Sequence, residues 1–306
     1  MKPTDRQGGG SALLSPRLLL IAVRPKTLTL ALVPVVVGSA LAWRDGAQPA
    51  WTVFLVTLVS ACCIQAGTNL FNDASDAERG NDGTERIGPA RVTGSGLAGA
   101  RQVKRTARAL FGLAFAGGIY LVAIGGWPIV AIGIASLIAG WAYSGGPRPL
   151  SYTPWGELFV IAFFGLVAVA GSHYLQAGGF SPEALLIGAV LGLPAAAVLL
   201  LNNLRDHLSD HRAGRCTLVQ LTGTRPAYWL YGLFMLAPFP LLAWIVHPAA
   251  LGAVWLALPL VVWLVWRCIR LPPSPAMNRL LALTAFSQVL FGGLLTVSFM
   301  LPGVAG

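Results

Sequence analysis

Two clusters of carboxylates stand out in this chain, because acidic residues are scarce elsewhere in it. Seven of its eleven acidic residues belong to them. They are Asp73, Asp76, Glu78, Asp82 and Glu85 in the segment 69–91, and Asp206 and Asp210 in the segment 202–218. Each cluster directly follows a long apolar run, so each is expected to lie where a membrane helix emerges into water.

The two clusters share one spacing. The first reads Asn72-x-x-x-Asp76-x-x-x-Gly80 and the second reads Asp206-x-x-x-Asp210-x-x-x-Gly214. Residues four apart lie on one face of a helix, so each pair would present its oxygens together. Such oxygens suit Mg²⁺, which shares its coordination with substrate phosphates. We therefore predict a shared magnesium site, whereas simple solvation of a helix end would explain a lone aspartate better than two matched clusters.

Basic residues lie beside both clusters. They are Arg79, Arg86 and Arg91 after the first, Arg205, Arg212 and Arg215 around the second, and Arg24, Lys26 and Arg148 in other polar segments. Carboxylates that hold a metal, with guanidinium groups nearby, are what a metal-bound polyphosphate requires. Taken singly, each arginine is also explained by the preference of cytoplasmic loops for positive charge.

Other chemistries fit the sequence less well. His207 and His211 have a spacing seen in zinc sites, but the first cluster contributes no His or Cys. The chain has no glycine-rich phosphate loop followed by Lys and no dinucleotide-binding fingerprint, so ATP hydrolysis and Rossmann-type redox chemistry are not expected. The four cysteines form no spaced metal or disulfide pattern.

The composition predicts an all-α, polytopic membrane protein. Hydrophobic residues make up 56% of the 306, charged residues 10%, and the mean hydropathy is +0.70. The net charge of +10 does not indicate nucleic-acid binding, because the basic residues fall between apolar runs rather than on one continuous face. The N-terminal segment lacks an A-x-A-like site before its first apolar run, which argues against a cleaved signal peptide.

Nine apolar segments are candidates for membrane spans of about 20 residues. They are Leu28–Trp43, Trp51–Asn69, Ala107–Gly125, Pro128–Tyr143, Leu158–Leu175, Ala184–Asn202, Tyr228–Val246, Ala249–Trp266 and Leu280–Leu301. With a cytoplasmic N-terminus, the inside segments and the inner ends of the spans hold every Lys and Arg except Arg44, as the positive-inside rule requires. Both acidic clusters then face the cytoplasm, and their offset of four helices suggests a parallel internal repeat with the ninth helix added.

The loop from Tyr143 to Tyr152, rich in Gly, Pro and Tyr, closes the fourth predicted span. It is either part of the rim of the shared site or a structural turn.

The motifs along nearly the whole chain resemble those of the UbiA superfamily of intramembrane aromatic prenyltransferases. They are Arg24-Pro25-Lys26-Thr27 with Pro34 and Gly38; Asn72-Asp73-x-x-Asp76 with Gly80, Asp82 and Arg86 to Arg91; Tyr143 with Gly146-Pro147; Gly156 with Phe163-Phe164-Gly165; and Asn202-Asn203-x-Arg205-Asp206-x-x-x-Asp210 with Gly214 and Thr217-Leu218. The spacing after Asp76, with Gly80 and the next acid at Asp82, resembles that of the branch that prenylates 1,4-dihydroxy-2-naphthoate in menaquinone synthesis. Arg215, His207 and His211 depart from that branch.

The resemblance implies nine helices around a central cavity, in a single transmembrane prenyltransferase domain of residues 18–306 after a polar, disordered arm of residues 1–17. It implies a multi-pass protein of the cell inner membrane with its active site facing the cytoplasm. Mg²⁺ would bind the diphosphate of a polyprenyl donor, and the resulting allylic cation would be attacked by 1,4-dihydroxy-2-naphthoate. Loss of CO₂ and diphosphate would then give a demethylmenaquinone.

The family's motifs assign roles by residue. The expected metal ligands are Asn72, Asp76, Asp82, Asp206 and Asp210, the expected catalytic acids are Asp73, Asp76, Asp206 and Asp210, and the expected diphosphate contacts are Lys26, Arg91 and Arg205. One alternative keeps the family with another acceptor, such as 4-hydroxybenzoate or homogentisate. The other is a membrane transporter, which would place functional acids near the bilayer midplane rather than at helix ends on one side.

Overall fold

The computed structural model describes residues 13–81, 87–89, 91–246 and 252–301, which form helices joined by turns, with no strand among them. In chain order these are α1 (Pro16–Val23), α2 (Pro25–Arg44), α3 (Trp51–Glu78), α4 (Ala100–Gly125), α5 (Trp127–Ala142), η1 (Leu150–Tyr152), α6 (Gly156–Ile161), η2 (Ala162–Val167), α7 (Ala168–Ala177), α8 (Pro182–Arg205), α9 (His207–Arg212), α10 (Leu218–Thr222), α11 (Thr224–Leu236), α12 (Pro238–Ile245), η4 (Val254–Ala257), α13 (Leu258–Arg270) and α14 (Met277–Met300). The all-helical prediction is confirmed for this part of the chain.

Seven helices of the described chain are long and apolar enough to cross a membrane. They are α2, α3, α4, the continuous helix α6–η2–α7, α8, the helix α11–α12, and α14. The fourth predicted span corresponds to α5, a shorter apolar helix of 16 residues, and the eighth overlaps η4 and α13. The count of nine spans and the cytoplasmic N-terminus stay predictions.

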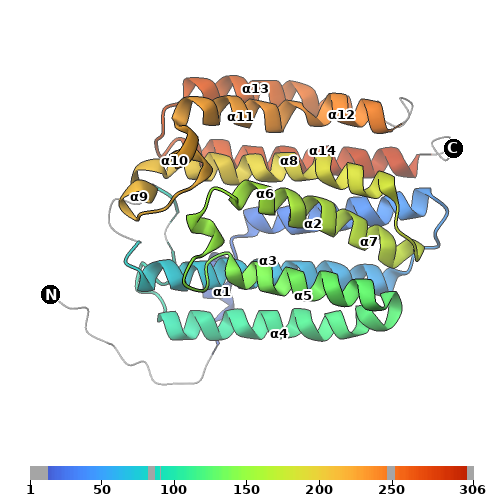
Figure 1. Ribbon diagram of the computed structural model, residues 1–306, viewed down its shortest axis with the longest axis horizontal. Coiled ribbons are helices and arrows are strands. Elements are labelled where there is room, and N and C mark those ends of the chain that lie inside the picture. The colour runs from blue at the N-terminus through green and yellow to red at the C-terminus, as the bar shows by residue number, and fades with distance from the viewer. Residues whose placement is uncertain (1–12, 82–86, 90, 247–251, 302–306) are drawn as a thin grey trace.

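The helices lie side by side in a bundle, with the short α9 and α10 together at one end (Figure 1). α3 packs on α4, and α2 packs on both α7 and α14. α8 contacts α6, η2, α11 and α14, so it runs through the middle of the bundle. Most of its residues are buried, which explains why its sequence is apolar on all sides.

Small residues allow α8 to approach the α6–η2–α7 helix closely. A Cβ atom on Gly165 would lie 2.3 Å from the carbonyl oxygen of Gly188, and one on Gly192 would lie 2.8 Å from the Cα of Ile161. Glycine is therefore required on both surfaces, as in close-packed membrane helices. The π-helical turn η2 falls at this contact.

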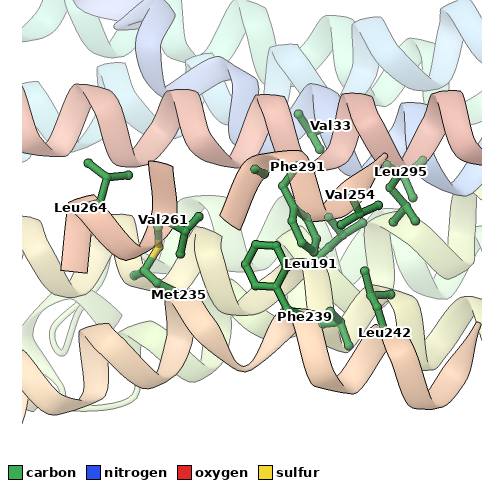
Figure 2. Close-up of a cluster of buried hydrophobic side chains, with 14 of the residues drawn as sticks. Val33, Leu191, Met235, Phe239, Leu242, Val254, Val261, Leu264, Phe291 and Leu295 are labelled. Atoms are coloured by element: carbon green, nitrogen blue, oxygen red, sulfur yellow. The ribbon is translucent and has the colours of Figure 1, made fainter. Parts of the chain in front are cut away.

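The largest apolar core joins α8 to the C-terminal helices (Figure 2). Phe239 of α12 and Phe291 of α14 meet edge to face at 5.4 Å between ring centroids, with Leu191 of α8 beside them in the same cluster. This packing fixes the far half of the bundle against α8, whose C-terminal end leads into α9.

Candidate active site

The helices that carry the two acidic motifs, α3 and α9, end in the same type of turn. Gly80 and Gly214 both adopt positive φ, of 75° and 68°, a conformation that costs glycine little. The residue after each glycine donates its N–H to the carbonyl of the motif's second aspartate: Asn81 to Asp76 at 2.9 Å, and Arg215 to Asp210 at 2.9 Å. The shared spacing found in the sequence is therefore a shared backbone geometry.

Arg215 joins the two motifs across the bundle. Its guanidinium donates to Asp76 Oδ1 at 2.7 Å and to Asp210 Oδ1 at 3.2 Å, and both aspartates are buried, with 1% and 4% of their surface exposed. Burial by itself would lower the pKa of Arg215, but the two carboxylates outweigh it and raise the pKa above its ordinary value. A cation thus sits between the two predicted metal-binding motifs.

Asp73 and Asp76 hold the segment that carries Arg91. Asp73 accepts hydrogen bonds from the backbone N–H groups of Val92 and Thr93, both at 2.9 Å. Arg91 pairs with Asp76 through the carboxylate oxygen that Arg215 does not use. Because both oxygens of Asp73 bond to backbone, its observed contacts position Arg91 relative to the site.

Asp206 lies where α8 gives way to α9, and Arg205 binds it in a fork. The two hydrogen bonds, from Nε and Nη2, measure 2.8 and 2.6 Å. The same guanidinium donates to Asn202 and to Asn278 of α14, at 2.8 Å each. Arg205, a predicted diphosphate contact, is therefore buried within a network that ties α8 to α14.

A cavity of about 580 Å³ lies beside these motifs. Among its polar lining residues are several from the two motifs, including Asn72, Asn81, Asn202, Asp206 and Asp210. Most of the remaining lining is apolar and comes from α2 to α8, including Phe159, Phe163 and Phe164. The cavity therefore joins a charged end to a long apolar interior.

The start of α2 brings Arg24 rather than Lys26 to this cavity. Arg24 is the only residue other than glycine with positive φ, at 54°, among the described residues, and Pro25 follows it at the first position of α2. Arg24 lines the cavity, whereas Lys26, a predicted diphosphate contact, is exposed. The bend at Arg24 turns one basic side chain inward and leaves the other on the surface.

The loop between α5 and α6 lies over the motifs as a rim. Arg79 donates to the carbonyl oxygens of Ser144 and Gly146 at 3.0 and 3.3 Å. The Tyr152 hydroxyl accepts from Asn81, and the guanidinium of Arg215 lies 5.0 Å from the centre of its ring. Of the two alternatives left open by the sequence, the position of this loop favours the rim.

The residues at the motifs fit a hard cation in part. The amide oxygen of Asn72 is buried and has no hydrogen-bond partner among the described residues, and Asp206 and Asp210 line the same cavity. No three His, Cys, Asp or Glu side chains converge in the described part of the chain, and Asp82 lies outside it. His207 is bonded at its Nδ1 to the Leu204 carbonyl and His211 is exposed, so neither points to zinc.

Sequence reasoning gave no specific role to Arg215 or Asn81. Both directly follow the motif glycine, and both reach Tyr152. The sequence signal that could have identified them is their equivalent position, directly after Gly80 and Gly214.

The chain matches the UbiA prenyltransferase family over residues 31–299. It is 39% identical to the 1,4-dihydroxy-2-naphthoate octaprenyltransferase of Escherichia coli over 210 residues, which cover 67% of this chain and 68% of that protein. It is 32% identical to the Bacillus subtilis enzyme of the same name over 295 residues, 93% of each chain.

Solved structures of the family share the fold. A UbiA homologue from Archaeoglobus fulgidus, bound to GPP and Mg²⁺, superposes with a TM-score of 0.63 and 16% identity over 93% of this chain and 100% of that one. A homologue from Aeropyrum pernix in its apo form gives a TM-score of 0.67 and 14% identity, covering 90% of this chain and 98% of that one.

Proposed function

Because the chain belongs to the UbiA prenyltransferase family, we propose that it transfers a polyprenyl group from polyprenyl diphosphate to 1,4-dihydroxy-2-naphthoate in menaquinone synthesis. The reaction releases CO₂ and diphosphate and gives a demethylmenaquinol, which oxidises to the demethylmenaquinone. The relatives named for this reaction, at 32% to 39% identity, support the choice of acceptor. The observation that carries the proposal is that Arg215 forms ion pairs with both acidic motifs at the charged end of a largely apolar cavity.

The motif residues would hold Mg²⁺. Asn72, Asp76, Asp206 and Asp210 supply the oxygen ligands, with Asp82 as a further one. The amide oxygen of Asn72, which has no partner among the described residues, supports this assignment. When bound, the metal neutralises the charge of the diphosphate and makes it a better leaving group. Asp73 serves the site through the backbone of Val92 and Thr93.

Guanidinium and ammonium groups stabilise the negative charge that develops on the departing diphosphate. Arg91 lines the cavity beside Asp76 and Arg24 lines it from the start of α2, so both are diphosphate contacts. Lys26 is exposed and Arg205 is held by Asp206. Each therefore contacts the diphosphate only after its side chain changes conformation.

The apolar part of the cavity protects the reaction from water. The allylic group carries positive charge as the diphosphate leaves, and a water molecule in reach would capture it. Phe159, Phe163 and Phe164 line this region, and aromatic faces both exclude water and stabilise a cation.

The protein sits in the cell inner membrane with its motifs facing the cytoplasm, where soluble acceptor and Mg²⁺ are available. It has nine spans, and residues 18–306 are one catalytic domain. At the end of the predicted arm, Leu14 is buried and α1 begins at Pro16, so these residues belong to the folded bundle. The distribution of Lys and Arg along the sequence supports this orientation.

The test is a turnover assay on purified protein in detergent or lipid. A long-chain polyprenyl diphosphate and Mg²⁺ are supplied with 1,4-dihydroxy-2-naphthoate or, in parallel, with 4-hydroxybenzoate or homogentisate, and products are identified by mass. We expect a prenylated naphthoquinol that has lost CO₂, formed only without EDTA. Asp76→Ala and Asp210→Ala should abolish turnover and leave folded protein.

The outcomes separate the alternatives. Product only with 4-hydroxybenzoate or homogentisate would keep the family's chemistry and refute the naphthoate acceptor. No product with any of the three, from protein shown to be folded, would refute the proposal and favour the transporter. Near-normal turnover in Asp76→Ala or Asp210→Ala would refute the metal assignment.

A further inference from the structure

Glu157 is a buried carboxylate for which the reaction above has no use. It lies in the first turn of α6 with 2% of its surface exposed. Its Oε1 accepts a hydrogen bond from Asn203 Nδ2 at 2.9 Å, and its Oε2 has no partner among the described residues. An acid inside a membrane-spanning helix is costly to bury, so its presence there indicates a function.

The partner of Glu157 lines the cavity. Asn203 lies on α8, one helical turn before the end that carries Asp206, and belongs to the cavity wall, as does Gly156 beside Glu157. The bond to Glu157 is the side-chain hydrogen bond recorded for Asn203 in the described structure. Its amide oxygen is therefore available to a molecule in the cavity.

The carboxylate determines which way this amide faces. Asn203 Nδ2 donates to Glu157 Oε1, so this hydrogen bond holds the nitrogen of Asn203 toward Glu157. The oxygen of Asn203 is then presented as an acceptor, and it suits an O–H donor rather than another carboxylate or a phosphate.

The surroundings fit a flat aromatic ligand. Phe159 and Phe163 stack with ring centroids 5.9 Å apart on the helix that carries Glu157, and both line the cavity. Tyr143, from the rim loop, lines it as well. A hydroxylated ring that lay against these side chains would be held between the charged motifs and the apolar interior, where the allylic carbon of the donor must be.

We propose that the Asn203 amide oxygen accepts a hydrogen bond from a ring hydroxyl of the aromatic acceptor, and that Glu157 is the positioning residue that orients this amide. The inference rests on the proposed function, and it adds an acceptor subsite. Asn203 and Glu157 accordingly determine affinity for the aromatic substrate and leave affinity for the diphosphate substrate unchanged.

The test compares four variants and a control variant in full-length protein. Asn203→Leu keeps the size of the side chain and removes the acceptor oxygen, and Asn203→Ser replaces it where the leucine variant is not recovered folded. Glu157→Met removes the group that orients the amide, whereas Glu157→Gln keeps an oxygen that Asn203 Nδ2 can bond. Tyr231→Phe is the control, because it removes another buried hydrogen bond, to Thr284 at 2.7 Å, in the core away from the cavity.

The readouts are the KM of each substrate and, without donor, binding of 1,4-dihydroxy-2-naphthoate by calorimetry in oxygen-free buffer. We expect the acceptor KM and Kd to rise about tenfold in the Asn203 variants and in Glu157→Met, as loss of a good hydrogen bond predicts. The donor KM should stay within about twofold of the wild type, and Glu157→Gln and Tyr231→Phe within about twofold for both substrates.

Three results would overturn the inference. An unchanged acceptor KM in a folded Asn203 variant would remove the subsite and leave the proposed function standing. Equal rises in both KM values would show that the pair only supports the fold. Wild-type protein that neither binds nor prenylates the naphthoate would refute the proposed function and this inference together.

Discussion

Replacing Arg215 by methionine tests how the two acidic motifs are held together. The change keeps an unbranched side chain and removes the hydrogen bonds of 2.7 Å to Asp76 and 3.2 Å to Asp210. Asp76 keeps its pairing with Arg91. A hydrogen bond to a charged group contributes about 1.5–3 kcal/mol and the longer bond less, so without metal we expect a loss of about 2–4 kcal/mol of stability. The melting temperature in EDTA should fall by roughly 3–6 °C.

Mg²⁺ should reverse part of this loss. The guanidinium of Arg215 occupies carboxylate oxygens that are predicted metal ligands, so metal and guanidinium compete for them. We expect Arg215→Met to bind Mg²⁺ about tenfold more tightly than the wild type, which is about 1.4 kcal/mol. At 100 times the variant's Kd, Mg²⁺ stabilises the variant by about 2.7 kcal/mol, and the same concentration stabilises the wild type by about 1.4 kcal/mol. The difference in stability between the two therefore narrows by about 1.3 kcal/mol.

The assay follows intrinsic fluorescence during heating in EDTA and in Mg²⁺, with calorimetry for metal affinity. Arg225→Met is the matched control, because Arg225 is exposed at the start of α11 and its loss should change neither quantity. An unchanged melting temperature in EDTA, together with unchanged or weaker Mg²⁺ binding, would refute the competition between Arg215 and the metal.

Three further changes probe the supports of the site. Asp73→Ala should destabilise the fold by about 1–3 kcal/mol and raise the donor KM, because two backbone N–H groups lose their acceptor; thermal unfolding and kinetics would detect it, and wild-type stability would contradict it. Gly165→Ala should lower the free energy of unfolding by about 1–3 kcal/mol or prevent folding, since its Cβ would lie 2.3 Å from a backbone oxygen of α8. Gly118→Ala is the control, because a Cβ there meets open space, and it should leave stability unchanged in the same unfolding assay. Arg24→Ala should raise the donor KM more than Lys26→Ala, because only Arg24 lines the cavity, and the reverse order would require Lys26 to move inward.

The helical bundle was predictable from the order of apolar segments. Long apolar runs must satisfy their backbone hydrogen bonds internally within a bilayer, so segments such as those of α3, α8 and α14 had one available structure. The short α5 and the interrupted η4–α13 were harder to judge from length alone, because a span of about 20 residues is only an average requirement. The π-helical turn η2 had no visible signal of its own, and the bend at Arg24 was marked in the sequence only by the interruption Arg24-Pro25-Lys26.

The sequence predicted that the two acidic motifs meet, as the structure shows, but it did not predict which side chains pair. Matched spacing placed Asp76 and Asp210 on helix ends, and the structure shows that the glycine four residues after each lies in a turn. The partners of Arg215 depend on the distance between α3 and α9, which are far apart in the sequence. The inward position of Arg24 and the outward position of Lys26 likewise depend on one backbone conformation.

The sequence by itself determined which residue types occupy the helix ends and which segments are apolar, because hydrophobicity and residue spacing are local properties. Only the tertiary structure decided that Arg215 bridges Asp76 and Asp210, that Asp73 bonds to backbone, and that Glu157 faces Asn203. Each of these contacts joins residues on two different elements, or joins a residue on an element to one in a distant loop. The close approach of helices at glycines such as Gly165 brings such residues into bonding distance, and no single stretch of sequence encodes that approach.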